Sequence, residues 1–291
     1  MPSDELRALL QSFRQHRFDP AIEVDSLRRR LDGFARLYPV DDNVHIEPCE
    51  IASRPAERVS AGPGPTILYF HGGGYVVGSP KSHRHLAARL AQDIAGTVIL
   101  FDYRLAPEAV FPAALDDCVA AYRELSGTPV SLAGDSAGGG LAIAVAVAAR
   151  ESGLPLPVSL WAASPWVNLG SENESYDLLS QVDPTLSREI AGWYSTRYLA
   201  GAASEDPRAS PLFADLSGLP PALIQVGDRE VFLGDALRLH QRLIAAKVDS
   251  EVVVAKEMFH VWHLHWPDLA EGRSAIKAAA DFLLRHHSAA A

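Results

Sequence analysis

Hydrophobic and polar positions along the chain follow two patterns that alternate with each other. Short apolar runs are separated by longer segments in which apolar residues recur at helical spacing. The runs predict buried strands near residues 66–70, 97–102, 129–133, 157–163, 221–226 and 250–255. The longer segments predict helices near residues 81–95, 111–126, 137–152, 234–247 and 271–286. Strands that alternate with helices indicate an α/β fold with a mostly parallel central sheet flanked by helices.

Three further segments lie outside that alternation. Residues 44–51, with a short piece nearby, are the candidates for two outer strands near the N-terminus. Residues 168–210 interrupt the rhythm of strands and contain a predicted helix near 187–199. Residues 1–40 are predicted to form amphipathic helices. Their two apolar faces consist of Leu6, Leu9, Leu10 and Phe13, and of Leu27, Leu31, Phe34 and Leu37.

Residues 1–40 and 168–210 are expected to form a helical cap. An insertion between two core strands, placed at their carboxyl ends, lies over that end of the sheet. In the alternative interpretation, these helices only extend the core. We therefore divide the chain into N-terminal cap helices (1–45), an α/β core (46–167 and 211–291) and a second cap segment (168–210).

Ser136 lies at the junction of a predicted strand and a predicted helix. An apolar strand ends in Gly134-Asp135-Ser136-Ala137-Gly138, and a helix-forming run follows at once. A nucleophile elbow requires this context, because its strained turn lifts the serine hydroxyl clear of the sheet edge. Small residues on both sides let the strand and the helix pass close together. A tight turn without chemistry is the alternative, since Gly-x-Ser-x-Gly alone is a weak pattern.

A glycine-rich loop, His71-Gly72-Gly73-Gly74, follows the predicted strand 66–70. Consecutive glycines leave backbone N–H groups uncovered and adopt the φ values that turn these groups inward. Acyl transfer through a serine builds negative charge on the former carbonyl oxygen and needs such donors. We expect the N–H groups of Gly73, Gly74 and Ala137 to supply them. A phosphate-binding loop is the alternative, but no Lys follows in Walker spacing.

The glycine-rich loop and the serine motif resemble those of the hormone-sensitive-lipase-like (GDSAG, family IV) bacterial esterases of the α/β-hydrolase superfamily. The resemblance covers roughly residues 60 to 285. The segments that carry it are His71–Gly74, Asp102–Glu108, Phe111–Ala114, Gly134–Gly139, Ser164–Trp166, Asp206-Pro207 and Ser210–Leu212. The resemblance implies an α/β-hydrolase fold with a helical cap, and Ser136 as the nucleophile of a Ser-His-acid triad.

The resemblance also directs the choice of the other two triad residues, which follow the serine in the order acid, then histidine. His260 matches the family's catalytic histidine. The loop after the strand near 221–226 offers Asp228 and Glu230, where the family carries Asp-Pro-Leu and this chain does not. Aligning the strand with the family pattern places Glu230 at the acid position, and its separation from His260 is typical of the group. We therefore favour Glu230 over Asp228.

A zinc site is the alternative interpretation of the histidines. His260, His263 and His265 lie close together in the sequence, and His83 and His85 lie upstream. Neither a His-Glu-x-x-His motif nor a Cys-rich cluster supports zinc. We therefore expect no metal and no other cofactor, and we expect His263 and His265 to be pocket-wall or surface groups.

Other residues near the motifs are expected to support the site without taking part in the chemistry. His71 is expected to brace its loop by hydrogen bonding, and Asp135 is expected to anchor a neighbouring loop. Tyr75 and Trp262 are candidates for apolar walls beside a bound ester. Two further groups are predicted, a polar brace made by Tyr103, Arg104 and Glu108, and a helix-capping or pairing role for Asp235.

These features predict a serine carboxylesterase that acts on small-molecule esters through an acyl-enzyme. The resemblance implies a capped, closed pocket, which suits short acyl chains, acetyl to hexanoyl. An amidase, a lactonase or a deacetylase of the same fold is an alternative. A non-catalytic receptor for a small ligand is an alternative from another class. Receptors related to these esterases lack the catalytic histidine, so the presence of His260 favours an enzyme.

Composition narrows the class of partners. Of the 291 residues, 48% are hydrophobic and 21% are charged, which is typical of a globular protein. A net charge of −10 gives no basic surface for nucleic acid, and no apolar run is long enough to predict a membrane span. Two cysteines and an acidic start without a signal peptide predict a cytoplasmic protein. The strand near 250–255 is expected at the sheet edge, where it favours a homodimer.

Overall fold

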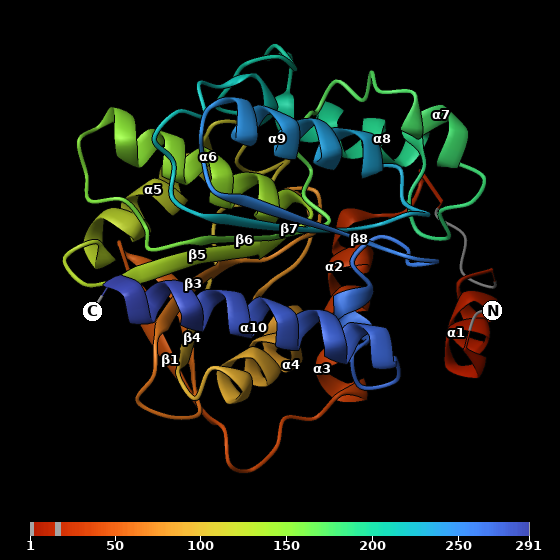
Figure 1. The fold of residues 1–291 in the computed structure, drawn as a ribbon. Coiled ribbons are helices and arrows are strands. Elements are labelled where there is room, and N and C mark those ends of the chain that lie inside the picture. Colours follow the sequence, from red (N-terminus) through yellow and green to blue (C-terminus); the bar gives the residue numbers. More distant parts are fainter. Residues whose placement is uncertain (1–2, 15–18, 291) are drawn as a thin grey trace.

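An eight-stranded sheet forms the centre of the computed structural model, which describes residues 3–14 and 19–290 (Figure 1). The strands are β1 (His45–Ile51), β2 (Arg54–Ser60), β3 (Thr66–Phe70), β4 (Thr97–Phe101), β5 (Val130–Asp135), β6 (Leu160–Ala163), β7 (Ala222–Gly227) and β8 (Ser250–Ala255). Their order in the sheet is β1-β2-β4-β3-β5-β6-β7-β8. Strand β2 is antiparallel to both of its neighbours, and the strands from β4 to β8 are parallel.

The predicted core strands are confirmed, with ends that differ by a few residues. Strand β3 pairs with β4 and β5, so that Leu68 lies opposite both Ile99 and Leu132. All three side chains are fully buried. Parallel strands covered on both faces need apolar residues at every position, which explains why their sequences are unbroken apolar runs.

Two layers of helices cover the sheet (Figure 1). Helices α5 (Ala113–Leu125), α6 (Ala137–Glu151) and α9 (Leu233–Ala245) pack on one face, and α4 (Pro80–Asp93) and α10 (Ala270–Ala290) pack on the other. Each layer buries its own hydrophobic cluster against the sheet. The architecture predicted from the alternation of strands and helices, a mostly parallel sheet covered by helices on both faces, is therefore confirmed.

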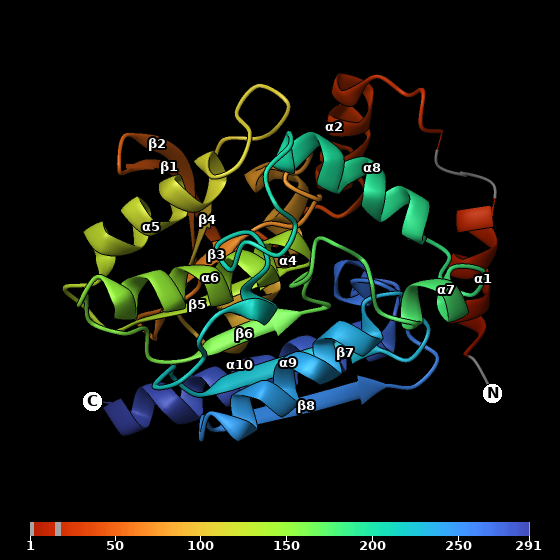
Figure 2. The ribbon, with the colours of Figure 1, turned by 90° about the horizontal axis from the view of Figure 1, so that it is seen from above.

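A further group of helices lies beyond the carboxyl ends of the central strands. Figure 2 shows α1, α2, α7 and α8 on the side toward which the arrows of the sheet point. The remaining elements are α1 (Asp4–Arg14), α2 (Val24–Asp32), α3 (Phe34–Leu37), α7 (Ser175–Leu179), α8 (Arg188–Leu199), η1 (Pro211–Phe213) and η2 (Trp262–His265). We call α1, α2, α7 and α8 the cap helices. Residues 1–2 and 15–18 of the predicted cap, and residue 291 of the predicted core, lie outside the described residues.

The apolar faces predicted for the N-terminal segment are only partly correct. Leu6 is fully buried in a cluster with Met258 and Phe259, as its place on an apolar face predicts. Leu27 and Leu31 are half-buried against the main core. Leu37, however, is 69% exposed. The short helix α3 ends at this residue, so helical spacing no longer turns its side chain toward the core.

Arg28 fixes helix α2 to the core. Its guanidinium donates to the backbone oxygens of Val76 and Ala106 at 3.0 Å each, and it forms a bidentate ion pair with Glu108. The predicted polar brace of Tyr103, Arg104 and Glu108 does not form as one unit, because Glu108 pairs with Arg28 of α2 and Tyr103 bonds the backbone of His71. Arg104, which was expected to share this brace, pairs with Asp117 instead.

Close backbone contact between β3, β5 and α6 sets the turn at Ser136. A Cβ at Gly138 would lie 1.9 Å from the carbonyl oxygen of Phe70, and a Cβ at Gly134 would lie 2.3 Å from that of Gly138. Both atoms are backbone, so no side-chain rotation relieves the clash. The two glycines of the Gly-x-Ser-x-Gly motif are therefore required by packing.

We expect Gly138→Ala to lower the free energy of unfolding by about 3 kcal/mol or more, because the new methyl group displaces backbone of β3. The matched control is Gly127→Ala, since a Cβ at Gly127 meets no atom within 4 Å. Its free energy of unfolding should change by less than about 1 kcal/mol. Urea unfolding of both variants checks the prediction, and equal stabilities would contradict it.

Candidate active site

Ser136 occupies a strained turn between β5 and α6. Its backbone has φ 53° and ψ −121°, a conformation that L-residues rarely adopt. The turn is held by backbone hydrogen bonds, from Ser136 N–H to the oxygen of Ala163 at 2.9 Å and from Trp166 N–H to the oxygen of Ser136 at 2.9 Å. This is the geometry of a nucleophile elbow.

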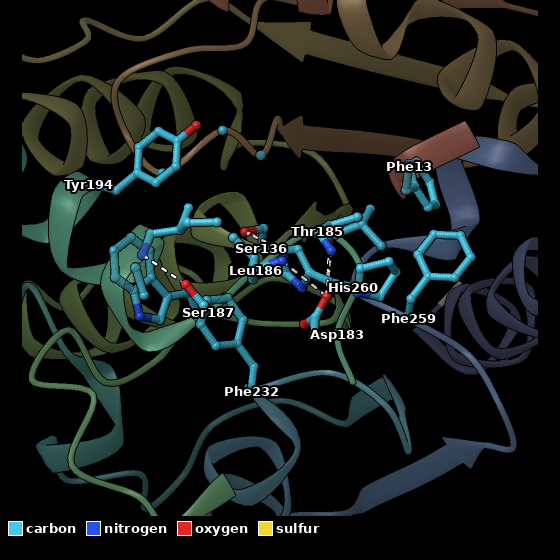
Figure 3. A pocket seen from close by; sticks show the side chains of 18 of the residues that line it. Phe13, Ser136, Asp183, Thr185, Leu186, Ser187, Tyr194, Phe232, Phe259 and His260 are labelled. Carbon is cyan, nitrogen blue, oxygen red and sulfur yellow. Dashed lines mark hydrogen bonds between the residues drawn. The ribbon is translucent and has the colours of Figure 1, made fainter. Parts of the chain in front are cut away.

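The structure brings His260 and Glu230 to this serine. The Ser136 hydroxyl lies 2.9 Å from Nε2 of His260. Figure 3 shows the two side chains next to each other. On the other side of the ring, Nδ1 lies 2.7 Å from Oε2 of Glu230. With the proton on Nδ1, this nitrogen donates to the carboxylate, and Nε2 is free to accept from the hydroxyl.

Glu230 is fully buried and its second oxygen is also satisfied. Oε1 accepts from the N–H of Gly227 at 2.5 Å and from the hydroxyl of Ser164 at 2.8 Å. The same hydroxyl accepts from the N–H of Val261, the neighbour of His260, at 3.1 Å. Ser164 thus joins the loops of the acid and the histidine. The sequence analysis gave it no role, although its place directly after β6 is a signal that could have found it.

Asp228, the other acid considered, does not reach the histidine in this structure. Its carboxylate accepts from the N–H of Glu257 at 2.6 Å and so fixes the loop after β8. Asp235 is buried in the first turn of α9 and pairs with Arg238 at 3.3 Å. This pairing within the helix agrees with the sequence interpretation of Asp235.

The glycine-rich loop borders the same space as Ser136. Gly73 and Gly74 have φ of +117° and +60°, which L side chains rarely adopt. A Cβ at Gly74 would also lie 2.5 Å from the ring of Tyr194 on α8. Within the described part of the chain, no residue accepts a hydrogen bond from the N–H of either glycine. The N–H of Ala137, at the start of α6, adds a third donor beside Ser136.

Asp135 anchors the glycine-rich loop from below. One oxygen of its carboxylate accepts from the Tyr69 hydroxyl at 2.8 Å and from the N–H of Gly72 at 3.0 Å, and His83 lies 3.3 Å from the other. Burial alone would raise the pKa of Asp135, but His83 and the hydrogen bonds outweigh it and hold this pKa below its usual value. Asp135 therefore remains an acceptor that fixes the loop, as predicted.

His71 braces the loop as predicted. Its Nδ1 lies 2.8 Å from the oxygen of Gly72, and its ring stacks on that of Tyr103 with centroids 4.3 Å apart. The Tyr103 hydroxyl donates to the oxygen of His71 at 2.6 Å. Burial lowers the pKa of His71 to about 3, so its ring is neutral at neutral pH.

A cavity of about 930 Å³ lies between this site and the cap helices. Figure 3 shows Tyr194 on one side of Ser136 and His260, and Phe13 and Phe259 on the other. Asp183, which the sequence analysis missed, also lines the cavity and is only 7% exposed. Burial is the largest cause that raises the pKa of this carboxyl, whereas nearby His260 lowers it.

Three predicted pocket residues lie elsewhere. Tyr75 is buried behind the loop, where its ring stacks on Tyr198 at 3.8 Å. Trp262 packs into the cluster around Leu6, so neither aromatic side chain forms a wall of the cavity. His263 is fully buried and hydrogen-bonds Gln225 of β7, so it is neither a wall nor a surface group. The pattern of aromatic residues did not reveal which side of the loop each one faces.

The other histidines have separate contacts and do not form one cluster. His265 does line the cavity, with its ring 5.4 Å from that of Phe13. His85 bonds the oxygen of Leu264 at 2.8 Å. Burial lowers the pKa of His85 and His265 to about 4 and that of His263 to about 3. Among the residues that the structure describes, no cluster of three or more His, Cys, Asp or Glu side chains forms a metal site.

In the described ranges, no helix combines the length and the apolar character needed to cross a membrane.

Comparison with known proteins agrees with the geometry. A family model described as alpha/beta hydrolase fold matches residues 67–264. An acetyl-hydrolase of Streptomyces hygroscopicus is 44% identical over 262 residues, which are 88% of this chain and 86% of that protein. An esterase of Acinetobacter venetianus is 33% identical over 266 residues, covering 89% of this chain and 88% of the relative.

A crystal structure agrees over almost the whole chain. It is that of an esterase from the bacterial hormone-sensitive lipase family, with 39% sequence identity and a TM-score of 0.95 over 98% of this chain and 99% of that one. Fold, serine motif, glycine-rich loop and relatives all agree. The chain therefore belongs to the α/β-hydrolase family, as a carboxylic ester hydrolase of the hormone-sensitive-lipase-like group.

Proposed function

We propose that this protein is a serine carboxylesterase whose triad consists of Ser136, His260 and Glu230. The observation that carries the proposal is the continuous chain of two hydrogen bonds, 2.9 Å from serine to imidazole and 2.7 Å from imidazole to carboxylate. A serine with a purely structural role would not need a hydrogen bond to an imidazole that a buried carboxylate holds in place. Asp228 is not in reach of the ring and has a partner of its own.

The reaction proceeds by two acyl transfers. His260 takes the proton of the Ser136 hydroxyl as its oxygen attacks the ester carbonyl. The resulting imidazolium is stabilised by the Glu230 carboxylate and then gives its proton to the leaving alcohol. A water molecule repeats the sequence on the acyl-enzyme, with His260 again as the base, and the acid is released.

The N–H groups of Gly73, Gly74 and Ala137 form the proposed oxyanion hole. The loop that carries Gly73 and Gly74 is preorganised by Asp135 and His71, so little reorganisation is needed when charge develops on the substrate oxygen. One such donor commonly contributes about 3 kcal/mol to transition-state stabilisation. The start of helix α6 adds the positive end of its dipole at the same point.

The proposed substrates are small-molecule esters with short acyl chains, acetyl to hexanoyl. Tyr194 closes one side of the cavity against the glycine-rich loop, which limits the room beside Ser136. The cavity volume leaves space for a larger alcohol. One relative is named an acetyl-hydrolase, which favours removal of acetyl groups, from nitrogen or oxygen, as the second candidate function.

Turnover of p-nitrophenyl esters tests the function. We expect hydrolysis of the acetyl to hexanoyl esters and a fall for longer acyl chains, because the acyl group must fit beside Tyr194. Ser136→Ala should lower kcat at least about a thousandfold. Binding of these esters without any turnover by the wild-type protein would instead indicate a receptor, and faster turnover of matched anilides would indicate an amidase.

Two isosteric variants test the acid. Glu230→Gln removes the charge that orients His260 and should lower kcat by about 10³- to 10⁴-fold. Asp228→Asn, the matched control, should lower it by less than about tenfold, because Asp228 bonds only a backbone N–H of the neighbouring loop. Steady-state kinetics of both variants on one ester decide between the two acids. A larger loss of kcat in Asp228→Asn than in Glu230→Gln would make Asp228 the acid.

We propose that the cap comprises residues 1–45 and 168–210, and that the core comprises residues 46–167 and 211–291. Support comes from the cavity, which is lined jointly by α2, by α8 and by the core loops around Ser136. A cytoplasmic location is supported by Cys49 and Cys118, which are both free thiols.

We also propose a homodimer formed through strand β8. This strand ends the sheet, and its Val253 and Val254 are 42% and 44% exposed. The expected mass by light scattering is that of two 31.4 kDa chains. Val254→Lys should yield monomers, because a charge on an edge strand opposes pairing. Leu178→Lys, on the exposed side of α7, should remain dimeric. A wild-type monomer would exclude the dimer.

A further inference from the structure

The peptide that follows the proposed triad acid is held by side chains from the segment 168–210. The N–H of Val231 donates to Oδ2 of Asp183 at 3.1 Å, and its carbonyl oxygen accepts from the hydroxyl of Ser175 at 2.6 Å. Val231 is fully buried and is the immediate neighbour of Glu230. Both backbone polar groups of Val231 are therefore satisfied by side chains from outside the core.

Asp183 is locked in the orientation that this contact needs. Its other oxygen, Oδ1, accepts from the N–H and the hydroxyl of Thr185 at 2.9 and 2.8 Å, and from the N–H of Leu186 at 3.0 Å. Figure 3 shows the bonds to Thr185 beside His260. Because these donors occupy Oδ1, Oδ2 remains directed at Val231.

Ser175 binds the turn that carries Glu230 at a second point. Its hydroxyl accepts from the N–H of Gly234 at 3.2 Å while it donates to Val231. Its own N–H donates to the side chain of Asn173 at 3.0 Å, which fixes the start of α7. The turn that carries Glu230 is thus bonded by two independent cap residues.

This turn and the core together set the position of the Glu230 carboxylate. The core fixes the end of the side chain through Gly227 and Ser164, whereas its backbone continues directly into the peptide of Val231. A shift of this peptide changes the 2.7 Å contact between Glu230 and His260. Displacements of about 1 Å in a catalytic group cost up to about a hundredfold in rate.

We propose that Asp183 is a positioning residue for catalysis: through the N–H of Val231 it holds Glu230 in place, and through Glu230 it orients His260. This role rests on the proposed triad. It makes the segment 168–210 a part of the frame that aligns the acid, in addition to a wall of the cavity.

The test variant is Asp183→Asn. The three donors on Oδ1 keep the amide oxygen in place, so the amide nitrogen faces the N–H of Val231, donor against donor. The variant keeps the size of the side chain and its turn with Thr185. It loses only its negative charge and its contact with the turn that carries Glu230.

The matched control is Asp177→Asn, the same chemical change in the same segment. Asp177 forms a bidentate pair with Arg188 at 2.8 Å on the surface. It neither lines the cavity nor contacts the turn that carries Glu230. A loss caused by general weakening of the cap would affect both variants. A loss caused by misplacement of Glu230 affects only Asp183→Asn.

With p-nitrophenyl butyrate, we expect Asp183→Asn to lower kcat about tenfold or more with KM changed less than about threefold, and Asp177→Asn to change kcat by less than about twofold. In proton NMR spectra, the far-downfield resonance of the His260 Nδ1–H should shift or broaden in Asp183→Asn and stay unchanged in Asp177→Asn. Ser175→Ala, which removes the other grip on Val231, should lower kcat about threefold or more and carries the test if Asp183→Asn does not fold.

Wild-type kcat and an unchanged imidazole resonance in Asp183→Asn would overturn the proposal, as would equal losses in the Asp177→Asn control. An effect confined to KM would also overturn it, because it would make Asp183 a binding group alone. Failure of the triad itself is distinguished by Ser136→Ala: if that variant retains activity, the proposed function fails whatever Asp183 does.

Discussion

The approach of three backbone segments at Gly134, Gly138 and Phe70 is the constraint on which the rest of the site depends. Contact at this distance leaves no room for a side chain and forces Ser136 into its strained φ. The strain is stored where the fold is most rigid, between buried strands and a buried helix. Every other group of the site is arranged around a hydroxyl whose position the core has already fixed.

The rest of the site is supplied by loops that leave the carboxyl ends of neighbouring strands. Ser164 follows β6, Glu230 follows β7 and His260 follows β8, so adjacent strands bring the three loops together. Ser164 then ties two of these loops to one hydroxyl. The glycine-rich loop after β3 completes the arrangement from the opposite side, and Asp135 keeps it at the level of the serine.

The sequence was sufficient for the features that have a local signature. The strands could be predicted because each is an apolar run, and the turn at Ser136 because small residues surround it. Leu37, Tyr75 and Trp262 were misjudged, since helical spacing and aromatic character do not state which neighbour a side chain meets. The sequence around Asp183 indicates at most its local turn with Thr185 and Leu186. Its contact with Val231, 48 positions away, forms only in the folded chain.

The bonds to Val231 have a consequence for the architecture. In a protein trimmed to its sheet and flanking helices, the N–H and the carbonyl of this buried residue would lose Asp183 and Ser175 together. Buried backbone groups left without partners are costly, and these two adjoin the acid. The segment 168–210 and the scaffold beneath it are therefore coupled through Val231, so a shortened form that lacked this segment would also lose part of the support for its acid.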